Sequence, residues 1–287
     1  MTIISGVVIG ALLFMSFGNN TIKISRYQVT LEGLPKSLDG LRIVHISDLH
    51  GKEFGPHNKR LARAIERQNP DLILVSGDMI DSRGDDGSAF IHLLDQLKGL
   101  DPVYCSLGNH EQIVKELTGT ERYNDFTQRI REAGAILLDN ERVAINREGA
   151  IIAIYGFSAM LYQYTGYDTT AWEGAALEAW FIEEKIGLPR EEELTLLLAH
   201  NPKYLVQYGQ WGADLILAGH VHGGVVRLPF VGGVFSPDMT LFPEYDAGLY
   251  SRGTAKMHVS RGLGNSVIPV RIFNRPDLSV ITLRVDS

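Results

Sequence analysis

The sequence has almost no cysteine and no concentration of positive charge, and each absence excludes a class of protein. Cys105 is the only cysteine among 287 residues, so the chain cannot form an internal disulfide. The formal net charge is −7, and no run of lysine or arginine occurs. A nucleic-acid-binding protein normally presents a basic face that neutralises phosphates. We therefore expect no nucleic-acid surface and no disulfide framework, and we expect Cys105 to be a small buried side chain in a core strand.

Charged side chains are absent from the first 22 residues, and Ile3 to Phe17 is almost wholly apolar. This length is just adequate for a membrane span. A cleaved secretory signal is not indicated, because the segment lacks a basic start and an Ala-x-Ala pattern. We predict that residues 1–22 form a single N-terminal anchor at the cell membrane, with a buried N-terminal helix as the alternative. Lys23 and Arg26 weakly favour a cytoplasmic position for the domain. Two charges do not determine on which face of the membrane the domain lies.

The rest of the chain has no internal repeat and no low-complexity linker, so we expect one domain over residues 30–287. Short apolar runs alternate with amphipathic stretches, which is typical of layered α/β domains. Helices are expected at 57–68 and 89–97. Strands are expected at 41–46, 71–76, 102–107, 135–145, 150–157, 194–199, 213–218 and within 267–285. Residues 227–250 are expected to be a long ordered loop or hairpin.

Five of the expected strands end in side chains that can bind a metal ion. In chain order these are Asp48 with His50, Asp78, Asn109 with His110 and Glu111, His200, and His220 with His222. Any one histidine would more often be an ordinary core or loop residue. Because open α/β sheets bind ligands at the carboxyl ends of their strands, five such ends together predict a metal centre at one edge of the fold.

In order and approximate spacing, these groups resemble the signature of the calcineurin-like metallophosphoesterases, from Leu41 to Gly223. The apolar N-terminus, Leu228-Pro229-Phe230 and the stretch from Ser260 to Ser266 are similar to the bacterial membrane-associated subgroup. The resemblance implies an α/β fold, a four-layer α/β/β/α sandwich of two mixed sheets with flanking helices.

The resemblance also implies a centre of two divalent metal ions. The ligands that it assigns are Asp48, His50 and His222 for the first ion, Asn109, His200 and His220 for the second, and Asp78 as the bridge. Nitrogen and oxygen donors without thiolates suit manganese, iron or zinc, and we favour manganese. The two ions would lower the pKa of a bridging water, and the hydroxide would attack phosphorus in line. His110 would be the catalytic residue that serves the leaving group, by protonating the departing alkoxide or by stabilising the charge in transfer.

Some of these residues have alternative roles. His110 could be a merely structural imidazole. Glu111 could orient His110, or it could cap the next helix, because acidic residues favour helix N-termini. Arg261 could reach a phosphate, although a surface position is the more ordinary role of an arginine.

An aromatic-rich insert occupies about residues 158–186. Its aromatic residues include Tyr162, Tyr164, Tyr167, Trp172, Trp180 and Phe181. Aromatic residues at helical spacing more often pack in a core. The alternative is a cap beside the metals that contacts the substrate or the membrane interface, where tryptophan and tyrosine are favoured.

The sequence therefore predicts a dinuclear metal-dependent phosphoesterase that hydrolyses phosphodiester or pyrophosphate bonds. A narrower alternative is a lipid-linked nucleotide pyrophosphohydrolase acting on a UDP-diacylglucosamine-type substrate, which the anchor and the aromatic insert motivate. An alternative of another class is a non-catalytic metal-dependent phosphate-binding protein. His110 favours an enzyme, because binding alone does not require a positioned acid. The expected partners are the phosphoester substrate and, through the N-terminal segment, the membrane.

Overall fold

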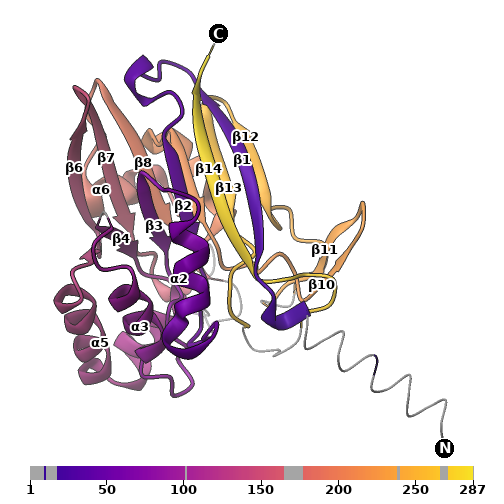
Figure 1. Ribbon diagram of the computed structural model, residues 1–287. Coiled ribbons are helices and arrows are strands. Elements are labelled where there is room, and N and C mark those ends of the chain that lie inside the picture. Colours follow the sequence, from indigo (N-terminus) through magenta and orange to yellow (C-terminus); the bar gives the residue numbers. More distant parts are fainter. Residues whose placement is uncertain are drawn as a thin grey trace, which may run out of the picture.

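Two six-stranded sheets, packed face to face, form the centre of the molecule, with helices on both outer faces (Figure 1). The computed structural model describes residues 10, 18–100, 102–164, 177–237, 240–265 and 271–286. Each sheet combines parallel and antiparallel strand pairs. The predicted fold, a sandwich of two mixed sheets with flanking helices, is confirmed.

The first sheet has the strand order β1-β14-β2-β3-β4-β5. Its strands are β1 (Lys23–Leu31), β2 (Arg42–Ile46), β3 (Leu72–Ser76), β4 (Val103–Ser106), β5 (Ile136–Leu137) and β14 (Asp277–Val285). The parallel strands β3 and β4 are buried along their whole length, as is usual for strands covered on both faces. The helices that cover this sheet are α2 (Lys59–Glu66), α3 (Ser88–Gln96) and α5 (Thr120–Glu132).

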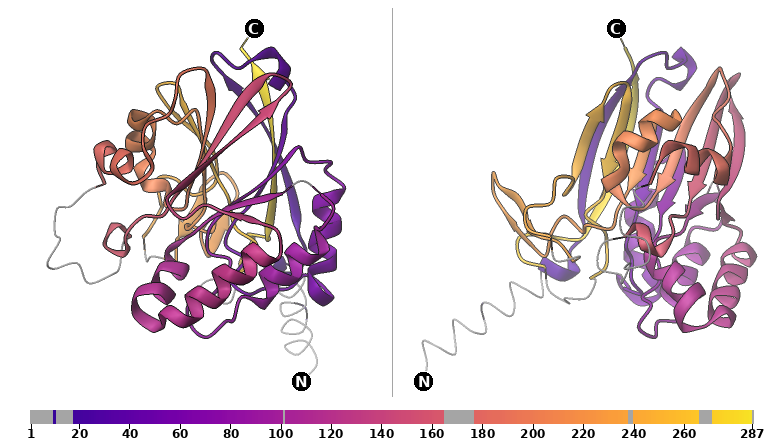
Figure 2. Two further views of the ribbon diagram at one scale, coloured as in Figure 1. Left: turned by 90° about the vertical axis from the view of Figure 1, so that its left-hand side faces the viewer. Right: turned by 180° about the vertical axis from the view of Figure 1, so that it is seen from behind.

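The second sheet has the order β12-β13-β9-β8-β7-β6. Its strands are β6 (Glu141–Arg147), β7 (Ala150–Phe157), β8 (Glu193–Ala199), β9 (Leu215–Ala218), β12 (Gly248–Arg252) and β13 (Ala255–Val259). Helices α6 (Ala179–Ile186) and α7 (Leu205–Trp211) cover its outer face (Figure 2). The remaining elements are the ribbon of β10 (Val226–Leu228) and β11 (Gly232–Phe235), the short helix α4 (Asn109–Ile113) and the helical turns Lys36–Leu38, Pro56–Asn58, Val114–Thr118, Leu161–Gln163 and Pro202–Tyr204.

Three apolar clusters fill the three interfaces between these four layers. One cluster includes Phe90 and packs α2, α3 and α5 against the first sheet. The second includes Leu74 and Leu196 and lies between the two sheets. The third includes Tyr208 and packs α6 and α7 against the second sheet. Burial of large apolar side chains at each interface is the main favourable contribution to the stability of the sandwich.

The prediction of one strand over residues 135–145 is wrong, because the chain changes sheets within it. Ile136 pairs with Tyr104 in the first sheet, whereas Glu141 pairs with Gly156 in the second. Between them Asn140 takes a left-handed backbone conformation with φ of 56°. Its side-chain oxygen accepts a hydrogen bond from the Ser158 N–H at 3.0 Å. The turn at Asn140 therefore divides the apolar run between two sheets, a tertiary arrangement that apolar periodicity does not reveal.

The N-terminal part of the domain begins earlier than residue 30, because β1 starts at Lys23 and pairs in parallel with β14. Residues 1–9 and 11–17, which hold most of the predicted membrane segment, lie outside the described residues, as do Tyr167 and Trp172 of the aromatic insert. Within the described part of the chain, no helix combines the length and apolar character needed to cross a membrane. The anchor remains a prediction.

Candidate metal centre and active site

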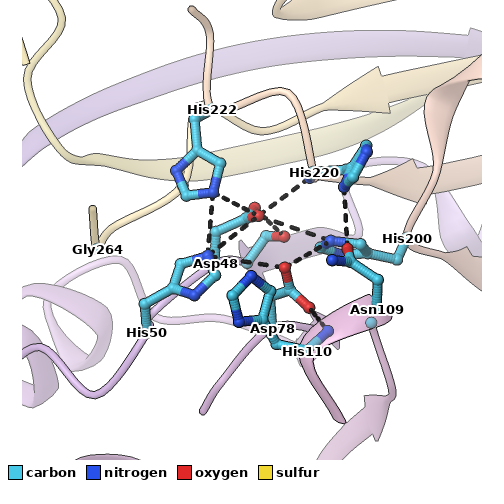
Figure 3. Close-up of polar contacts among 12 residues, drawn as sticks. Asp48, His50, Asp78, Asn109, His110, His200, His220, His222 and Gly264 are labelled. Carbon is cyan, nitrogen blue, oxygen red and sulfur yellow. Dashed lines mark hydrogen bonds and ion pairs between the residues drawn. The ribbon is translucent and has the colours of Figure 1, made fainter. Parts of the chain in front are cut away.

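The side chains predicted from the strand ends converge on one place (Figure 3). Strands β2, β3 and β4 of the first sheet are parallel and end at the same edge, and β8 and β9 of the second sheet are parallel in the same way. The two edges lie next to each other: the His200 ring accordingly reaches Ser76, at the end of β3. The seven predicted ligands and His110 all lie in this region, and each sheet contributes part of the set.

The first group of potential ligands consists of Asp48, His50 and His222, whose donor atoms lie within 4.8 Å of one another. The Nε2 atom of His222 is 3.2 Å from Oδ1 of Asp48. It is also 3.0 Å from Nε2 of His50. All three residues are buried. Two imidazole nitrogens and a carboxylate oxygen directed at one point form a donor set that suits a divalent cation.

The second group consists of Asp78, His200 and His220, with Asn109 beside it. The Nδ1 atom of His220 is 3.0 Å from Oδ1 of Asn109, and Nε2 of His200 is 3.1 Å from Oδ2 of Asp78. Nδ1 of His200 lies 2.8 Å from the carbonyl oxygen of Ser76, to which it donates. That hydrogen bond leaves Nε2 as the ring nitrogen that could bind a metal ion. Nε2 is buried and close to the Asp78 carboxylate, but it forms no hydrogen bond of suitable geometry there, which a cation bound between the two groups would explain.

The two carboxylates are ionised although they are buried. Burial raises the pKa of Asp48, but the neighbouring His222 and His200 outweigh burial and hold the pKa below its usual range. Burial likewise raises the pKa of Asp78, and His200 and His110 hold it well below its usual range. The same effects act in the opposite directions on His200. Burial lowers the pKa of His200, whereas the charges of Asp78 and Asp48 raise it to about 9. Buried negative charge of this kind requires a positive partner.

Most of the predicted ligands have a strained backbone. The left-handed φ angles are 53° at Asp48, 46° at His50, 55° at Asp78, 70° at His220 and 55° at His222. Each non-glycine residue in this conformation costs about 1–3 kcal/mol, and such residues gather at functional sites. Here the surrounding backbone fixes the strained loops. The His50 N–H donates to the Asp78 carbonyl at 3.1 Å, and the Gly264 N–H donates to the Asp48 carbonyl at 2.6 Å.

Two glycines allow the carboxylates to pack against the neighbouring loops. A Cβ atom on Gly108 would lie 2.2 Å from Oδ1 of Asp78, and one on Gly219 would lie 2.3 Å from Oδ2 of Asp48. Real Cβ atoms do not approach other atoms so closely, so any side chain at either position would displace a predicted ligand.

Glu111 caps helix α4 and also holds the loop that carries Asp78. Its carboxylate accepts the Gly108 N–H at 2.8 Å, which is the helix cap. It also accepts the N–H groups of Asp78, Met79 and Ile80, at 3.0, 2.7 and 3.2 Å. Burial and the Asp78 charge raise the pKa of Glu111. Of the two predicted roles, capping is therefore the one that these contacts support.

His110 has the hydrogen bonds of a proton donor. Its Nδ1 accepts the Ser82 N–H at 3.0 Å, so the neutral imidazole carries its proton on Nε2. The backbone N–H of His110 donates to Oδ1 of Asp78 at 2.9 Å. Its ring packs edge-on against the His50 ring, with 4.5 Å between centroids. These contacts fix the imidazole beside the candidate metal centre and leave its Nε2–H to donate a hydrogen bond.

Sequence reasoning missed the residues that hold the His222 loop. The side-chain amide of Asn274 donates to the carbonyl oxygens of His222 and Gly224, at 2.7 and 2.6 Å. The Arg271 guanidinium is buried and lies 3.2 Å from Nδ1 of His222. No sequence motif marks these two residues. They reach the His222 loop because the segment around Ile272 pairs with β10 at Val226.

The surface position expected for Arg261 is wrong. Arg261 is buried, and its guanidinium donates to the carboxylate of Asp277 and to the hydroxyl of Ser25. The ion pair with a buried aspartate explains the burial, because a charge inside a protein requires a partner. In the aromatic insert, Tyr164 is also buried, and its ring lies 5.1 Å from that of His220. Tyr164 thus packs on a predicted ligand, and the cap remains a prediction.

Comparison with known proteins agrees with this geometry. The family model of calcineurin-like phosphoesterases matches residues 41–224. The chain belongs to this family. It is therefore a metal-dependent phosphoester hydrolase that uses divalent metal ions, and the non-catalytic alternative no longer applies.

Curated relatives match most of the chain. The phosphodiesterase YaeI of Escherichia coli is 31% identical over 248 residues, which cover 84% of this chain and 82% of the relative. The uncharacterized metallophosphoesterase YkuE of Bacillus subtilis is 26% identical over 268 residues, covering 92% and 86%. A metallophosphoesterase of Aquifex aeolicus is 28% identical over 269 residues, covering 92% of both chains.

Proposed function

We propose that this hydrolase cleaves phosphodiester or pyrophosphate bonds with two divalent cations that share Asp78. The supporting observation is the position of Asp78 between the two ligand groups. Its Oδ2 atom is 3.6 Å from Nε2 of His50, in the first group, and 3.1 Å from Nε2 of His200, in the second. A carboxylate oxygen that lies between two sets of nitrogen donors is well placed to bridge two metal ions. The ligands that we propose are the seven residues named in the sequence analysis.

The donor set fits the proposed ions. It contains imidazoles, carboxylates and one amide, with no thiolate, which suits manganese, iron or zinc, and we favour manganese. Such ions, when bound, polarise the phosphoryl oxygens and make water a usable nucleophile near neutral pH.

The residues of the chain then orient the substrate and stabilise the leaving group. His110 presents its Nε2–H to the leaving-group oxygen and stabilises the negative charge that develops there, since its Nδ1 already accepts the Ser82 N–H. The hydrogen bond from the His110 N–H to Asp78 couples the position of this imidazole to the metal centre. Glu111 acts indirectly, by fixing the backbone of the Asp78 loop through its accepted N–H groups.

A pocket beside the metal centre supports a diester rather than a simple monoester. It measures about 370 Å³ and is lined by His220, Lys203 and Tyr245, among others. A monoester needs little space beyond the phosphoryl group, whereas a pocket of this size can bind the second ester substituent. The name of the Escherichia coli relative, a phosphodiesterase, points in the same direction.

The membrane anchor at residues 1–22 is part of the proposal, and it places the protein at the cell membrane. The absence of charge from this segment supports it. A relative of Danio rerio named as a transmembrane protein with a metallophosphoesterase domain is 26% identical over 274 residues, covering 91% of this chain and 57% of the relative. A membrane position would suit a lipid-linked nucleotide pyrophosphate as the substrate, which we keep as the second candidate.

The test is metal-dependent hydrolysis of an aryl phosphodiester, an aryl phosphomonoester and a UDP-linked lipid in mixed micelles. Asp78→Asn is compared with Asp214→Asn, a control at the opposite end of the second sheet, where Asp214 accepts the Thr195 N–H. We expect diester cleavage by wild type and the control, and none by Asp78→Asn. Preference for the UDP-linked lipid would select the second candidate. Monoester cleavage alone, or activity retained in Asp78→Asn, would contradict the proposal.

A further inference from the structure

One end of the molecule exposes a concentrated set of large apolar side chains. Of the fourteen large hydrophobic residues that the described part of the chain exposes, seven belong to this set: Leu228, Phe230, Val231, Leu241, Phe242, Ile272 and Phe273. They lie on the ribbon of β10 and β11, which projects from the domain in Figure 1, and on the two segments bridged to it. We call these seven residues the apolar tip. A concentration of exposed large apolar side chains of this kind indicates an interaction surface.

The phenylalanines of the apolar tip have a strained backbone. The φ angles are 65° at Phe230, 49° at Phe242 and 54° at Phe273. The left-handed conformation costs a bulky residue about 1–2 kcal/mol, whereas glycine would adopt it freely. Phe230 is fully exposed, and the other two are 61% and 62% exposed, so packing within the chain offsets little of this cost. Contact with something outside the chain would explain why these positions carry phenylalanine.

Positive charge lies directly beside the tip. An open pocket of about 550 Å³ is lined by Phe230 and Phe273 and by four charged residues, Lys23, Arg227, Arg261 and Asp246. Arg227 is paired with Asp246, and Arg261 is paired with Asp277. Lys23 forms no ion pair with a described residue.

The charge balance in this pocket is therefore positive. The Arg261 charge, followed by burial, lowers the pKa of Lys23, and Asp277 offsets part of this effect. The pocket contrasts with the chain as a whole, which carries a net charge of −7. An apolar surface next to a cationic pocket matches the boundary of a membrane, where acyl chains meet anionic phosphates.

The N-terminal part of the chain enters the domain at this same end. The Arg271 N–H donates to the Asn19 side chain at 3.0 Å, immediately before Ile272 and Phe273 in the sequence. Arg275 donates to the carbonyl oxygen of Thr21 at 3.1 Å. Asn19 and Thr21 thus lie beside the segment that carries Ile272 and Phe273.

We propose that the apolar tip inserts into the interface of a membrane containing anionic phospholipid, and that a lipid phosphate enters the pocket of Lys23, Arg227 and Arg261. The Arg227 guanidinium also donates to the carbonyl oxygen of Gly223, next to His222, at 3.1 Å. Docking would therefore turn the edge of the fold that carries the metal centre toward the bilayer. This inference does not depend on the chemistry of the metal centre.

A fluorescent label at the tip tests the insertion. The full chain with Phe230→Cys is labelled with an environment-sensitive dye and reconstituted into vesicles of phosphatidylcholine with an increasing share of phosphatidylglycerol. Native Cys105 does not compete for the label, because it is buried and burial raises its pKa to about 12. The matched control is Glu32→Cys, an exposed site just past the other end of β1.

We expect the dye at residue 230 to brighten several-fold and shift to the blue as the anionic share rises, and the dye at residue 32 to remain in water. This readout is local, so it stays valid if residues 1–22 anchor the chain independently. A water-like signal at residue 230 at every lipid composition would overturn the proposal, even if the chain is vesicle-bound, and would leave a protein partner as the occupant of the tip.

Lys23→Glu tests the phosphate pocket. It is compared with Lys36→Glu, the same charge change at the opposite end of the domain, each in the labelled Phe230→Cys background. Because each basic side chain near an anionic surface strengthens attachment about fivefold, reversing one charge weakens it by on the order of tenfold or more. We expect Lys23→Glu to require a several-fold higher share of phosphatidylglycerol to reach half of the fluorescence change. Lys36→Glu should require the same share as the labelled protein with Lys23 and Lys36 intact. Equal shifts in the two variants would rule out the pocket as the phosphate site.

Discussion

The metal centre and the apolar tip share an unusual backbone feature and differ in everything that surrounds it. Both place non-glycine residues in the left-handed region, for example Asp48 and Asp78 in the centre and Phe230 and Phe273 in the tip. In the centre, buried hydrogen bonds hold the strained residues and the polar atoms face one another. In the tip, the side chains face solvent. The centre is thus stabilised largely by contacts within the chain, whereas the tip leaves large apolar side chains exposed.

The largest expected effect is that of Asp78→Asn on turnover. The variant keeps an oxygen that accepts the His110 N–H, but it loses the charge between the two ligand groups. Since bound metal ions supply several kcal/mol of transition-state stabilisation, turnover of the aryl diester should fall by about a thousandfold or more. Elemental analysis should show fewer bound ions per chain.

The same substitution sharpens the comparison between the two regions. In the labelled Phe230→Cys protein, Asp78→Asn should leave the vesicle-induced fluorescence change unaltered, because the tip does not share contacts with Asp78. A parallel loss of turnover and insertion would show that the two regions are not independent.

His110→Ala should have the next largest effect, and its size should depend on the leaving group. General acid catalysis contributes about a hundredfold to ten-thousandfold when the leaving group is a poor one. We expect a loss of at least about a hundredfold with an alkyl ester and a much smaller loss with a nitrophenyl ester, whose leaving group needs no proton. Metal content should be unchanged. An equal loss with both esters, or loss of metal, would indicate the structural role for His110.

Glu111→Gln should have a smaller effect, and the effect should be on the stability of the fold rather than on turnover. The amide cannot accept all four N–H groups that the carboxylate accepts from Gly108, Asp78, Met79 and Ile80. Leaving buried donors unsatisfied costs about 1–3 kcal/mol, which corresponds to a fall in Tm of several degrees. Thermal unfolding in the presence of a chelator checks this without the contribution of bound ions. An unchanged Tm would mean that the Asp78 loop does not depend on Glu111.

The smallest effect distinguishes the tip most clearly from the centre. Phe230→Gly should raise the free energy of unfolding by about 1 kcal/mol in water, because it removes left-handed strain at an exposed site. The same change should weaken insertion into anionic vesicles. Turnover of a soluble diester should be unaffected. If Phe230→Gly destabilises the protein in water, the side chain packs within the chain and the comparison fails.

The sequence was sufficient to predict that the candidate site residues converge, because they sit at strand ends and apolar runs mark strands well. The parallel strands β2, β3, β4, β8 and β9 follow such runs, and the resemblance connected their ends. Contacts between distant segments were not visible in the same way. The sheet change at Asn140, the burial of Arg261 against Asp277 and the contact of Asn274 with the His222 loop each depend on tertiary packing. Local pattern carries no information on such partners.

The central claim is that two ions share Asp78, and titration of metal-free protein with manganese tests it most directly. Diester hydrolysis and bound metal are measured together as the ion is added, in wild type and in Asp78→Asn. The account predicts that activity in wild type reaches its maximum at two ions per chain and that the variant stays inactive with fewer ions bound. Full activity at one ion per chain, or full activity without added metal in protein shown to be metal-free, would contradict it.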